Sequence, residues 1–338
     1  MACSYLSLHS RLKKTSVLMK AIVYKSTGSW YILKDESGHW WNARIKGVMK
    51  LDSITSTNPV AVGDIVEIES EDNSVPDSSR DNREQKENSA IISEIYNRRN
   101  YINRQSPRAK YQHHIIAANI DQSLMIATIK EPRTSQGFID RFLVASEMYH
   151  IPALIVFNKA DLHKKKEQEK FEKWKQIYEA VGYKVLLMSI KENKRIEEVR
   201  ELLNQKTTLI SGHSGVGKSA FINTIIPELE LKTQDVSGWS GKGLHTTTFA
   251  EMFDLPLGGT IIDTPGMREF GMVDLPKQEL SHYFPEMREL LVHCQFNNCL
   301  HINEPGCAVK TAVMNEKIHE DRYVSYFNIL DSIEQKSY

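Results

Sequence analysis

Residues 212–219 read Gly212-His213-Ser214-Gly215-Val216-Gly217-Lys218-Ser219. A β-branched run before them, residues 207–211, indicates a strand, and an apolar run after them, residues 220–226, indicates the first turns of a helix. Strand, glycine-rich loop, Lys-Ser and helix form the P-loop arrangement, in which backbone N–H groups and the helix N-terminus face phosphate oxygens. Lys218 is expected to contact the β- and γ-phosphates and the Ser219 hydroxyl to bind Mg²⁺. The expected phosphate ligands are Gly212, His213, Ser214, Gly215, Val216, Gly217, Lys218, Ser219 and Ala220.

The composition is that of an ordinary globular protein without charge bias. The 338 residues include 43 Lys and Arg against 43 Asp and Glu, so a nucleic-acid surface would have to come from local clustering. No apolar run approaches about 18 residues, so no membrane-spanning helix is expected. Three of the four cysteines lie within fourteen residues, which favours a metal site over disulfides and a reducing compartment.

Residues 20–96 are expected to form a small β-barrel. Five short β-branched or aromatic runs indicate strands at residues 21–24, 30–34, 40–45, 65–69 and 91–95. Five strands in so short a segment favour an OB-fold. The polar residues 70–89 are expected to form a disordered loop inserted before the last strand.

Aromatic and basic residues alternate in this segment, and two interpretations of them stay open. They are Trp30, Tyr31, Trp40 and Trp41 with Lys25, Lys34, Arg44 and Lys46. They can form a surface that stacks RNA bases and attracts phosphates, or the aromatic side chains can fill the barrel, where alternation would place about half of them. Residues 98–104 form a basic linker that contacts RNA in one interpretation and is a solvated connector in the other.

From about residue 112 the pattern changes to alternating strands and helices. Strands are expected at residues 123–129, 153–157, 184–188 and 207–211, and helices at residues 138–149, 164–180 and 196–203. This alternation predicts a mostly parallel α/β sheet with helices on both faces.

Asn158-Lys159-Ala160-Asp161 directly follows the expected strand at residues 153–157. Side chains at the carboxyl end of a parallel strand face the ligand crevice. The Asp161 carboxylate can accept hydrogen bonds from N1–H and the exocyclic amino group of guanine, whereas ATP would leave it unpaired. Ser189, after the next strand, is expected to contact the guanine carbonyl. GTP or GDP is therefore the expected ligand, and an ATP-using kinase is disfavoured.

A third motif, Asp263-Thr264-Pro265-Gly266, ends an expected strand at residues 259–262. Asp263 is expected to hold the Mg²⁺ shell, and the Gly266 N–H to contact the γ-phosphate. The glycine-rich segment 238–248 ends in Thr246, Thr247 and Thr248; one threonine hydroxyl is the expected second Mg²⁺ ligand, with Thr247 as the candidate and the choice among the three open. Residues 158–161 form the expected base-reading motif, and they precede the P-loop in the sequence. The motifs are therefore rotated along the chain relative to ordinary GTPases. That order predicts a circularly permuted GTPase.

The C-terminal region contains Cys294, Cys299, His301 and Cys307 around a Pro-Gly turn. Three thiolates and one imidazole suit a closed tetrahedral site for one structural Zn²⁺ in a small helical domain. His293 is an alternative ligand to His301. Buried free cysteines with an incidental histidine are the alternative to a metal site.

These motifs together resemble the ribosome small-subunit-dependent GTPase A (RsgA) family. The resemblance is carried by residues 158–161, 212–219, 243–248, 263–266 and 294–307 and covers nearly the whole chain. It implies GTP hydrolysis that is stimulated by the small ribosomal subunit, late in subunit assembly, in the bacterial cytoplasm. It also implies that the barrel and the zinc domain bind ribosomal RNA. A monomer is expected.

The expected division of the chain has four parts. They are a disordered extension at 1–18, an OB-fold RNA-binding domain at 19–108, a permuted GTPase domain at 109–275 and a zinc-binding domain at 276–338.

The catalytic candidates are His245, Lys218 and Thr247. Met267 follows the third motif where many GTPases have a glutamine, and it cannot orient water, so slow hydrolysis accelerated by a partner is expected. His245 is the candidate for positioning the water, with His213 as its rival and an RNA contact as its other interpretation. A GTP-gated RNA-binding module, in which hydrolysis only resets binding, is the alternative function.

Overall fold

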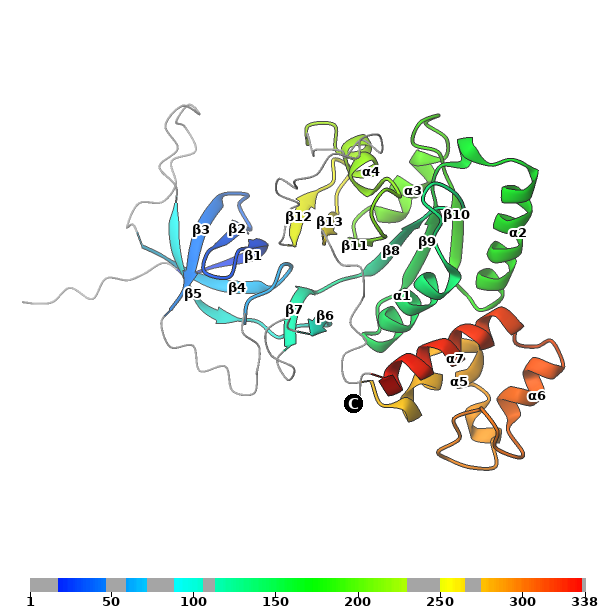
Figure 1. Cartoon of the computed structure of the whole chain (residues 1–338). Coiled ribbons are helices and arrows are strands. Elements are labelled where there is room, and N and C mark those ends of the chain that lie inside the picture. Colours follow the sequence, from blue (N-terminus) through cyan, green and yellow to red (C-terminus); the bar gives the residue numbers. More distant parts are fainter. Residues whose placement is uncertain are drawn as a thin grey trace, which may run out of the picture.

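The computed structural model describes residues 18–46, 59–71, 88–105, 113–229, 250–264 and 275–335. A β-barrel, an α/β domain and a small helical domain follow one another along the chain (Figure 1). The expected extension up to residue 17, most of the polar loop at 70–89 and the segment 238–248 lie outside the described residues.

The N-terminal strands close into a five-stranded barrel. They are β1 (Leu18–Ser26), β2 (Tyr31–Asp35), β3 (Trp40–Ile45), β4 (Ile65–Ser70) and β5 (Ser89–Ile95). Their order is β1-β2-β3-β5-β4, and β4 pairs back onto β1. The pairing of β3 with β5 is parallel, and the other pairings in the barrel are antiparallel. The predicted OB-like barrel is confirmed.

The aromatic residues of the barrel divide between its interior and its surface. Tyr31 and Trp41 are buried in the barrel core, and the Trp41 indole N–H donates to the Asp35 carboxylate at 2.9 Å. Trp30 and Trp40 are about half exposed. Neighbouring residues of a strand point to opposite faces, so each Trp-Tyr or Trp-Trp pair contributes one side chain to each side.

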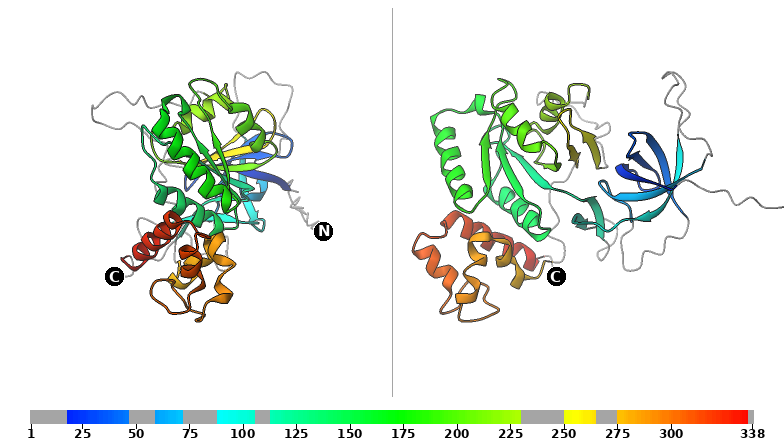
Figure 2. Two further views of the ribbon diagram at one scale, coloured as in Figure 1. Left: turned by 90° about the vertical axis from the view of Figure 1, so that its right-hand side faces the viewer. Right: turned by 180° about the vertical axis from the view of Figure 1, so that it is seen from behind.

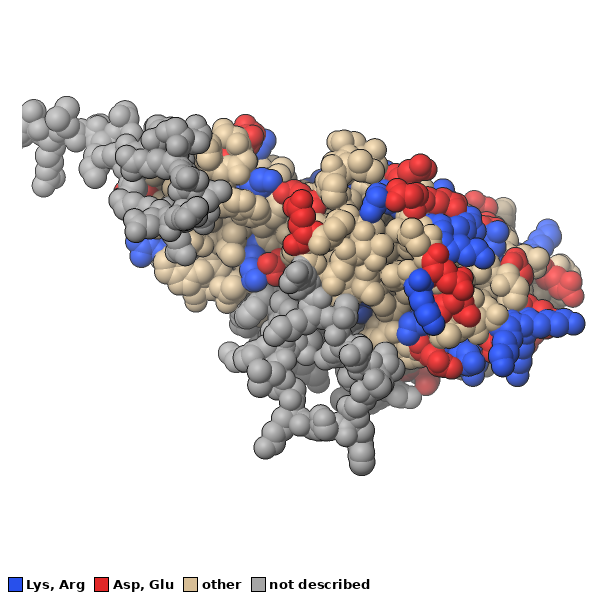
Figure 3. Space-filling model, turned by 90° about the horizontal axis from the view of Figure 1, so that it is seen from above, with Lys and Arg blue, Asp and Glu red and all other residues tan. Residues whose placement is uncertain are grey.

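The basic residues that alternate with these aromatics all form ion pairs within the chain. The pairs are Lys25–Glu251 at 3.0 Å, Lys34–Asp254 at 2.6 Å, Arg44–Glu71 at 2.5 Å and Lys46–Glu69 at 3.5 Å. An RNA phosphate at any of these positions would therefore have to displace a carboxylate. In the space-filling view of Figure 3, Lys and Arg side chains likewise lie beside Asp and Glu side chains across the described part of the visible face.

Residues 101–104 of the expected linker are instead part of a hairpin, so the segment is not a simple connector, and the RNA contact stays a prediction. Strand β6 (Tyr101–Gln105) pairs antiparallel with β7 (His113–Ala118). Arg98, expected to contact RNA or solvent, donates to the buried Asp64 carboxylate at 2.6 Å. The two strands are short and of mixed polarity, so the sequence shows no clear period of apolar residues. Each strand is stabilised by its partner, and residues 106–112 between them lie outside the described residues.

The α/β domain is built on six strands. Its elements are β8 (Gln122–Ala127), α1 (Gln136–Met148), β9 (Ala153–Phe157), the 3₁₀ turn η1 (Ala160–Leu162), α2 (Lys165–Ala180), β10 (Lys184–Leu187), α3 (Ile196–Leu203), β11 (Thr207–Ser211), α4 (Lys218–Ile225), β12 (Glu251–Asp254) and β13 (Thr260–Asp263). The strand order is β10-β9-β8-β11-β13-β12. Only β12 runs antiparallel to its neighbour among these described strands. The predicted mostly parallel sheet is confirmed.

Helices cover both faces of this sheet (Figures 1 and 2). Phe142 of α1 and Trp174 of α2 join one buried cluster with the sheet. Val199 of α3 and Phe221 of α4 join another cluster on the opposite face. The central strand β8 is buried along its whole length, as expected for a parallel strand covered on both sides.

The barrel is joined to the α/β domain through β12. Strand β1 pairs with β12 at Lys25 and Glu251, which makes one continuous eleven-stranded sheet. The Tyr24 hydroxyl donates to Asp254 at 2.6 Å, and the Lys34 ammonium lies between Asp254 and the ring of Trp40. Trp40 is therefore at the seam between the two domains, and its exposure does not by itself mark a base-stacking surface.

The C-terminal domain packs against α1. Its elements are the 3₁₀ helix η2 (Lys277–Tyr283), α5 (Pro285–Arg288), the 3₁₀ turn η3 (Leu291–His293), α6 (Ala308–Met314) and α7 (Glu320–Gln335). Val144 of α1 lies in the core of this domain. Among the described residues, no helix combines the length and apolarity needed to cross a bilayer.

Candidate nucleotide site and metal cluster

The predicted nucleotide motifs meet at one edge of the sheet. The strand pairings align Phe157 with both Ala127 and Leu187, Ser211 with Met125, and Ile210 with Asp263. These pairings place the carboxyl ends of five neighbouring parallel strands, β10, β9, β8, β11 and β13, at one edge, so the segments that follow them leave the sheet side by side. The base-reading motif, the P-loop and Asp263 are therefore brought together although they are spread over more than a hundred residues.

The P-loop depends on its glycines at two positions. Gly217 has φ +101°, and a Cβ atom there would lie 2.4 Å from Nδ2 of Asn158. Gly212 has φ +146°, and a Cβ atom there would lie 2.3 Å from the carbonyl oxygen of Ile126. Only glycine combines these backbone angles with such close approaches. The loop thus contacts the neighbouring strand β8 and the base-reading motif directly.

Lys218 and Asp263 are the two charged groups at the centre of the edge. The Lys218 ammonium donates to the carbonyl oxygens of Gly212 and His213, which closes the loop on itself. Burial lowers the pKa of Lys218, and the charge of Asp263 opposes this shift. Burial raises the pKa of Asp263, and Lys218 opposes that shift. Each charge thus stabilises the other in a site that is mostly shielded from water.

Three buried oxygen atoms beside these charges have no hydrogen-bond partner within the described part of the chain. They belong to Ser211, Asp263 and Thr264 at the ends of β11 and β13. Buried polar oxygens require a donor or a cation. Hard oxygen ligands are those that Mg²⁺ prefers, so this corner of the site fits the ion that a bound nucleotide brings.

Asn158 holds the P-loop to the base-reading motif. It is buried, its amide donates to the Val216 carbonyl at 2.8 Å, and its amide oxygen accepts from the Ile190 N–H at 3.3 Å. One side chain therefore fixes three segments that follow three different strands. Only one hydrogen of the Asn158 amide nitrogen is used in the contact with Val216, so the predicted contact with the nucleotide stays a prediction.

Asp161 is oriented by Ser189. The Ser189 hydroxyl is fully buried and donates to Asp161 Oδ1 at 2.7 Å, while it accepts from the Glu192 N–H. The sequence predicts that Ser189 contacts the guanine carbonyl; in this structure the proton of its hydroxyl is donated to Asp161. Within the described residues no other hydrogen bond to the Asp161 carboxylate is found, so its remaining lone pairs can accept from a ligand.

Other predicted site residues divide into described and undescribed ones. Lys159, in a left-handed conformation, donates to the Glu131 carbonyl at 2.6 Å. Both ring nitrogens of His213 have partners, which are the Thr134 hydroxyl and the Ser214 carbonyl. His245, Thr247 and Gly266 lie outside the described residues.

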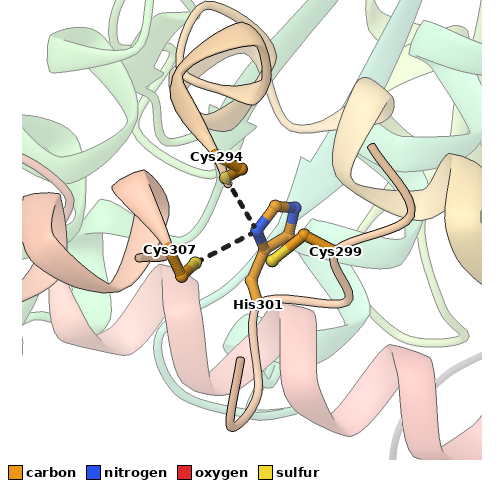
Figure 4. A group of neighbouring side chains, drawn as sticks. All are labelled: Cys294, Cys299, His301 and Cys307. Atoms are coloured by element: carbon orange, nitrogen blue, oxygen red, sulfur yellow. Dashed lines mark hydrogen bonds between the residues drawn. The ribbon is translucent and has the colours of Figure 1, made fainter. Parts of the chain in front are cut away.

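The four predicted metal ligands converge in the C-terminal domain (Figure 4). The ligand atoms of Cys294, Cys299, His301 and Cys307 all lie within 4.8 Å of one another. Nδ1 of His301 points at the sulfur atoms, at 3.3 Å from Cys307 and 3.7 Å from Cys294. The set fits a tetrahedral structural site for Zn²⁺, because soft thiolates and one imidazole fill every position. His293, the alternative ligand, is exposed and does not belong to the group.

Burial disfavours the charged thiolate form of these cysteines unless a cation is bound beside them. It raises the pKa of Cys299 to about 12 and also raises the pKa of Cys307. Burial likewise lowers the pKa of His301, so the imidazole is neutral and able to act as a ligand. Tyr323 and Tyr326 of α7 donate to the carbonyls of His301 and Leu300, which holds the loop against the helix.

Comparison with protein families matches the chain to two family models. The model described as RsgA GTPase covers residues 95–273, and the model described as RsgA N-terminal domain covers residues 20–75. The chain belongs to the RsgA family. It is therefore a GTP hydrolase, and the rotated order of its motifs is that of a circularly permuted GTPase.

Individual relatives agree with this assignment over their full length. The chain is 47% identical over 313 residues to the small ribosomal subunit biogenesis GTPase RsgA of Flavobacterium psychrophilum, covering 93% of each protein. It is 44% identical over 320 residues to the protein of that name from Bacteroides fragilis, covering 95% of this chain and 99% of the relative.

Solved structures are similar across all three domains. The crystal structure of YjeQ from Thermotoga maritima has a TM-score of 0.73 at 30% identity, covering 94% of this chain and 98% of that one. The structure of YloQ, described as a circularly permuted GTPase, has a TM-score of 0.70 at 26% identity, covering 97% and 99%.

Sequence reasoning missed several residues of this RsgA-family site. Thr134 contacts the P-loop residue His213, but the two are 79 residues apart and no motif joins them. The buried hydroxyls of Ser211 and Thr264 lie at strand ends beside the predicted motifs, and this position in the sequence could have identified them as site residues.

Proposed function

We propose that this GTPase acts in the biogenesis of the small ribosomal subunit and that the subunit stimulates its GTP hydrolysis. The observation that carries the proposal is identity of 44–47% to proteins named small ribosomal subunit biogenesis GTPase, over nearly the full length of both chains. Its partners are then the small subunit, its ribosomal RNA and GTP or GDP. The protein would act as a monomer in the cytoplasm, where these subunits mature.

The proposed nucleotide contacts follow the site geometry. Asp161 recognises the guanine edge, with Ser189 orienting it, and Asn158, Lys159 and Ala160 complete the base-reading motif. The phosphates are bound by the P-loop with Lys218 and by the first helical residues Ser219 and Ala220. The convergence of these segments at one edge of the sheet supports the proposal.

Hydrolysis requires an in-line water and stabilisation of the charge on the γ-phosphoryl group. Lys218 would supply positive charge, and Mg²⁺ held by Ser219, Thr247 and Asp263 would neutralise charge on the phosphates. The Gly266 N–H is proposed to contact the γ-phosphate. His245 is proposed to position the water, since His213 has both ring nitrogens engaged elsewhere.

The direct test is single-turnover GTP hydrolysis with and without isolated small ribosomal subunits. We expect acceleration by at least about tenfold with small subunits and none with large subunits, because an ordered switch completes the charge stabilisation. The Lys218→Ala variant gives the background from contaminating enzymes. Equal rates with small subunits, large subunits and buffer would overturn the proposal. Retained acceleration in His245→Ala would exclude that residue as the one that positions the water.

The GTP-gated RNA-binding module remains the second candidate function. It is distinguished by comparing subunit affinity in the presence of GDP and of a non-hydrolysable GTP analogue. Tight binding with the analogue and weak binding with GDP would favour gating, whereas equal affinities would favour an enzyme that acts on RNA during hydrolysis.

We also propose that the Cys294, Cys299, His301 and Cys307 cluster binds one structural Zn²⁺. Metal analysis of the purified full chain is expected to give about one zinc per chain, because these residues make up one complete tetrahedral ligand set. His301→Ala should lower the zinc content and destabilise the C-terminal domain, since folding of such a loop depends on its metal. His293→Ala is the matched control and should retain zinc. Equal zinc loss in both variants, or in neither, would contradict this ligand set.

The domain division stays a proposal. It assigns residues 19–108 to the barrel domain, 109–275 to the GTPase domain and 276–338 to the zinc domain, with residues 1–18 as an extension. The paired strands β6 and β7 lie on opposite sides of the proposed boundary between the barrel domain and the GTPase domain.

A further inference from the structure

The loop between β8 and α1, residues 128–135, contacts both nucleotide-binding motifs, and we call it the bridging loop. The Lys159 ammonium of the base-reading motif donates to the Glu131 carbonyl at 2.6 Å. On the P-loop side, Pro132 lies against Gly215, where a Cβ atom would be 3.4 Å from its ring. The sequence motifs that indicated the nucleotide site do not include this loop, yet it contacts two of them.

Thr134 makes the polar contact between the bridging loop and the P-loop. Its side chain is fully buried, and its hydroxyl oxygen lies 2.7 Å from Nε2 of His213. The hydroxyl accepts from the Thr128 N–H at 3.0 Å, and the Thr134 N–H donates to the Thr128 carbonyl at 2.9 Å. Because the oxygen already accepts from Thr128, its proton is free to be donated to His213.

The His213 ring can receive this proton in its neutral form. Its Nδ1 lies 3.1 Å from the Ser214 carbonyl, which is an acceptor, so Nδ1 carries the hydrogen and Nε2 accepts. The edge of the ring packs against Phe138 in the first turn of α1, with the centroids 5.5 Å apart. The carbonyl of His213 accepts from the Lys218 ammonium at 3.1 Å. Thr134 is thus two contacts away from the phosphate-binding lysine.

We propose that Thr134 is a positioning residue of the nucleotide site, which fixes the first half of the P-loop through His213 and thereby sets its affinity for nucleotide phosphates. The proposal rests on the assignment of residues 212–219 as the phosphate site. A glycine-rich loop loses much conformational entropy when it is ordered. Ordering it before the nucleotide arrives removes that cost from binding.

The test measures the dissociation constant of a fluorescent GDP analogue for Thr134 variants of the full chain. Thr134→Val has nearly the same shape without the hydroxyl, and we expect binding about tenfold weaker, the effect of one buried hydrogen bond. Thr134→Ser keeps the hydroxyl and is expected to bind within about twofold of the parent protein. Thermal unfolding is recorded for each variant to show that it is folded.

A double-mutant cycle separates positioning through His213 from a general loss of structure. His213→Ala alone should weaken GDP binding about as much as Thr134→Val, and the double variant should bind no more weakly than His213→Ala. Unchanged affinity in either single variant, or additive losses in the double variant, would overturn the proposal. If Thr134→Val fails to fold, Thr134→Ala replaces it in the cycle, because alanine also removes the hydroxyl, and the same outcomes decide.

Lys218→Ala distinguishes failure of this inference from failure of the site assignment. If Lys218→Ala binds GDP as well as the parent protein does, the phosphate site itself is wrongly assigned. If it loses binding while Thr134→Val does not, only the role of Thr134 is refuted.

Discussion

Asp161→Asn is expected to weaken GTP binding at least about 100-fold and to make xanthosine triphosphate the preferred nucleotide. The proposed contact consists of two hydrogen bonds to a carboxylate, and bonds to charged groups contribute about 1.5–3 kcal/mol each. In the variant, an amide N–H₂ would face the exocyclic amino group of guanine, donor against donor. Xanthine has a carbonyl oxygen at that position, which accepts from the amide.

The structure fixes which way the new amide would point. Ser189 donates to Oδ1 of Asp161, so the oxygen of an asparagine should remain on the Ser189 side and its nitrogen should take the place of Oδ2. The exchange of base preference thus requires no rearrangement of the site. A variant that merely loosened the loop would lose both nucleotides instead.

The measurement is competition of GTP, ATP and xanthosine triphosphate against a fluorescent guanine nucleotide. The matched control is Glu192→Gln, which removes an exposed negative charge from the same loop and is expected to leave the preference unchanged. Tight GTP binding by Asp161→Asn, or no gain for xanthosine triphosphate, would refute the role of Asp161. That result would leave the family assignment intact, because the assignment rests on the family matches.

The second large effect is expected at the contact between α1 and the C-terminal helical domain, where Arg322→Met should lower the free energy of unfolding by about 3–5 kcal/mol. Arg322 of α7 is buried, donates to Asp140 of α1, and pairs with Glu286 of α5 at 2.7 Å. Burial opposes its charge, but the two carboxylates hold its pKa above the ordinary value. Removing the guanidinium leaves buried carboxylates without a partner.

Arg288→Met is the matched control for this prediction. Arg288 also joins the zinc domain to α1, through Glu147, but its side chain is 48% exposed. Exposed ion pairs contribute about 0–1 kcal/mol, so this variant should be nearly as stable as the parent protein. Urea denaturation in buffer of constant zinc concentration measures both. Similar losses in the two variants would show that Arg322 is not a buried anchor.

Adding Asp140→Asn to Arg322→Met should restore part of the stability. The double variant removes one of the two unpaired charges, and the amide can still accept from the Tyr178 hydroxyl, which lies 3.0 Å from Asp140. A double variant less stable than Arg322→Met would contradict the account of stranded charge.

Motifs that rely on one backbone geometry could be predicted from the sequence, and those that rely on distant packing could not. The glycines at 212 and 217 signal a loop that only glycine can form, and the strand and helix around them are local patterns. The hairpin of β6 and β7 was missed because its strands have no clear period and depend on each other. Arg98 looked like a free cation because its partner Asp64 is 34 residues away.

The sequence by itself determined the class of the fold, the permuted order of the motifs and the cluster of three cysteines and one histidine, because each is encoded by residue types at short spacing. The tertiary structure decided which polar groups are free and which are already engaged. It assigned Ser189 to Asp161 and Thr134 to His213, and it paired Lys25 and Lys34 of the barrel with β12. The physical reason is that a hydrogen-bond donor or a charge is used up by its nearest partner, and that partner is chosen by the packing of the whole chain.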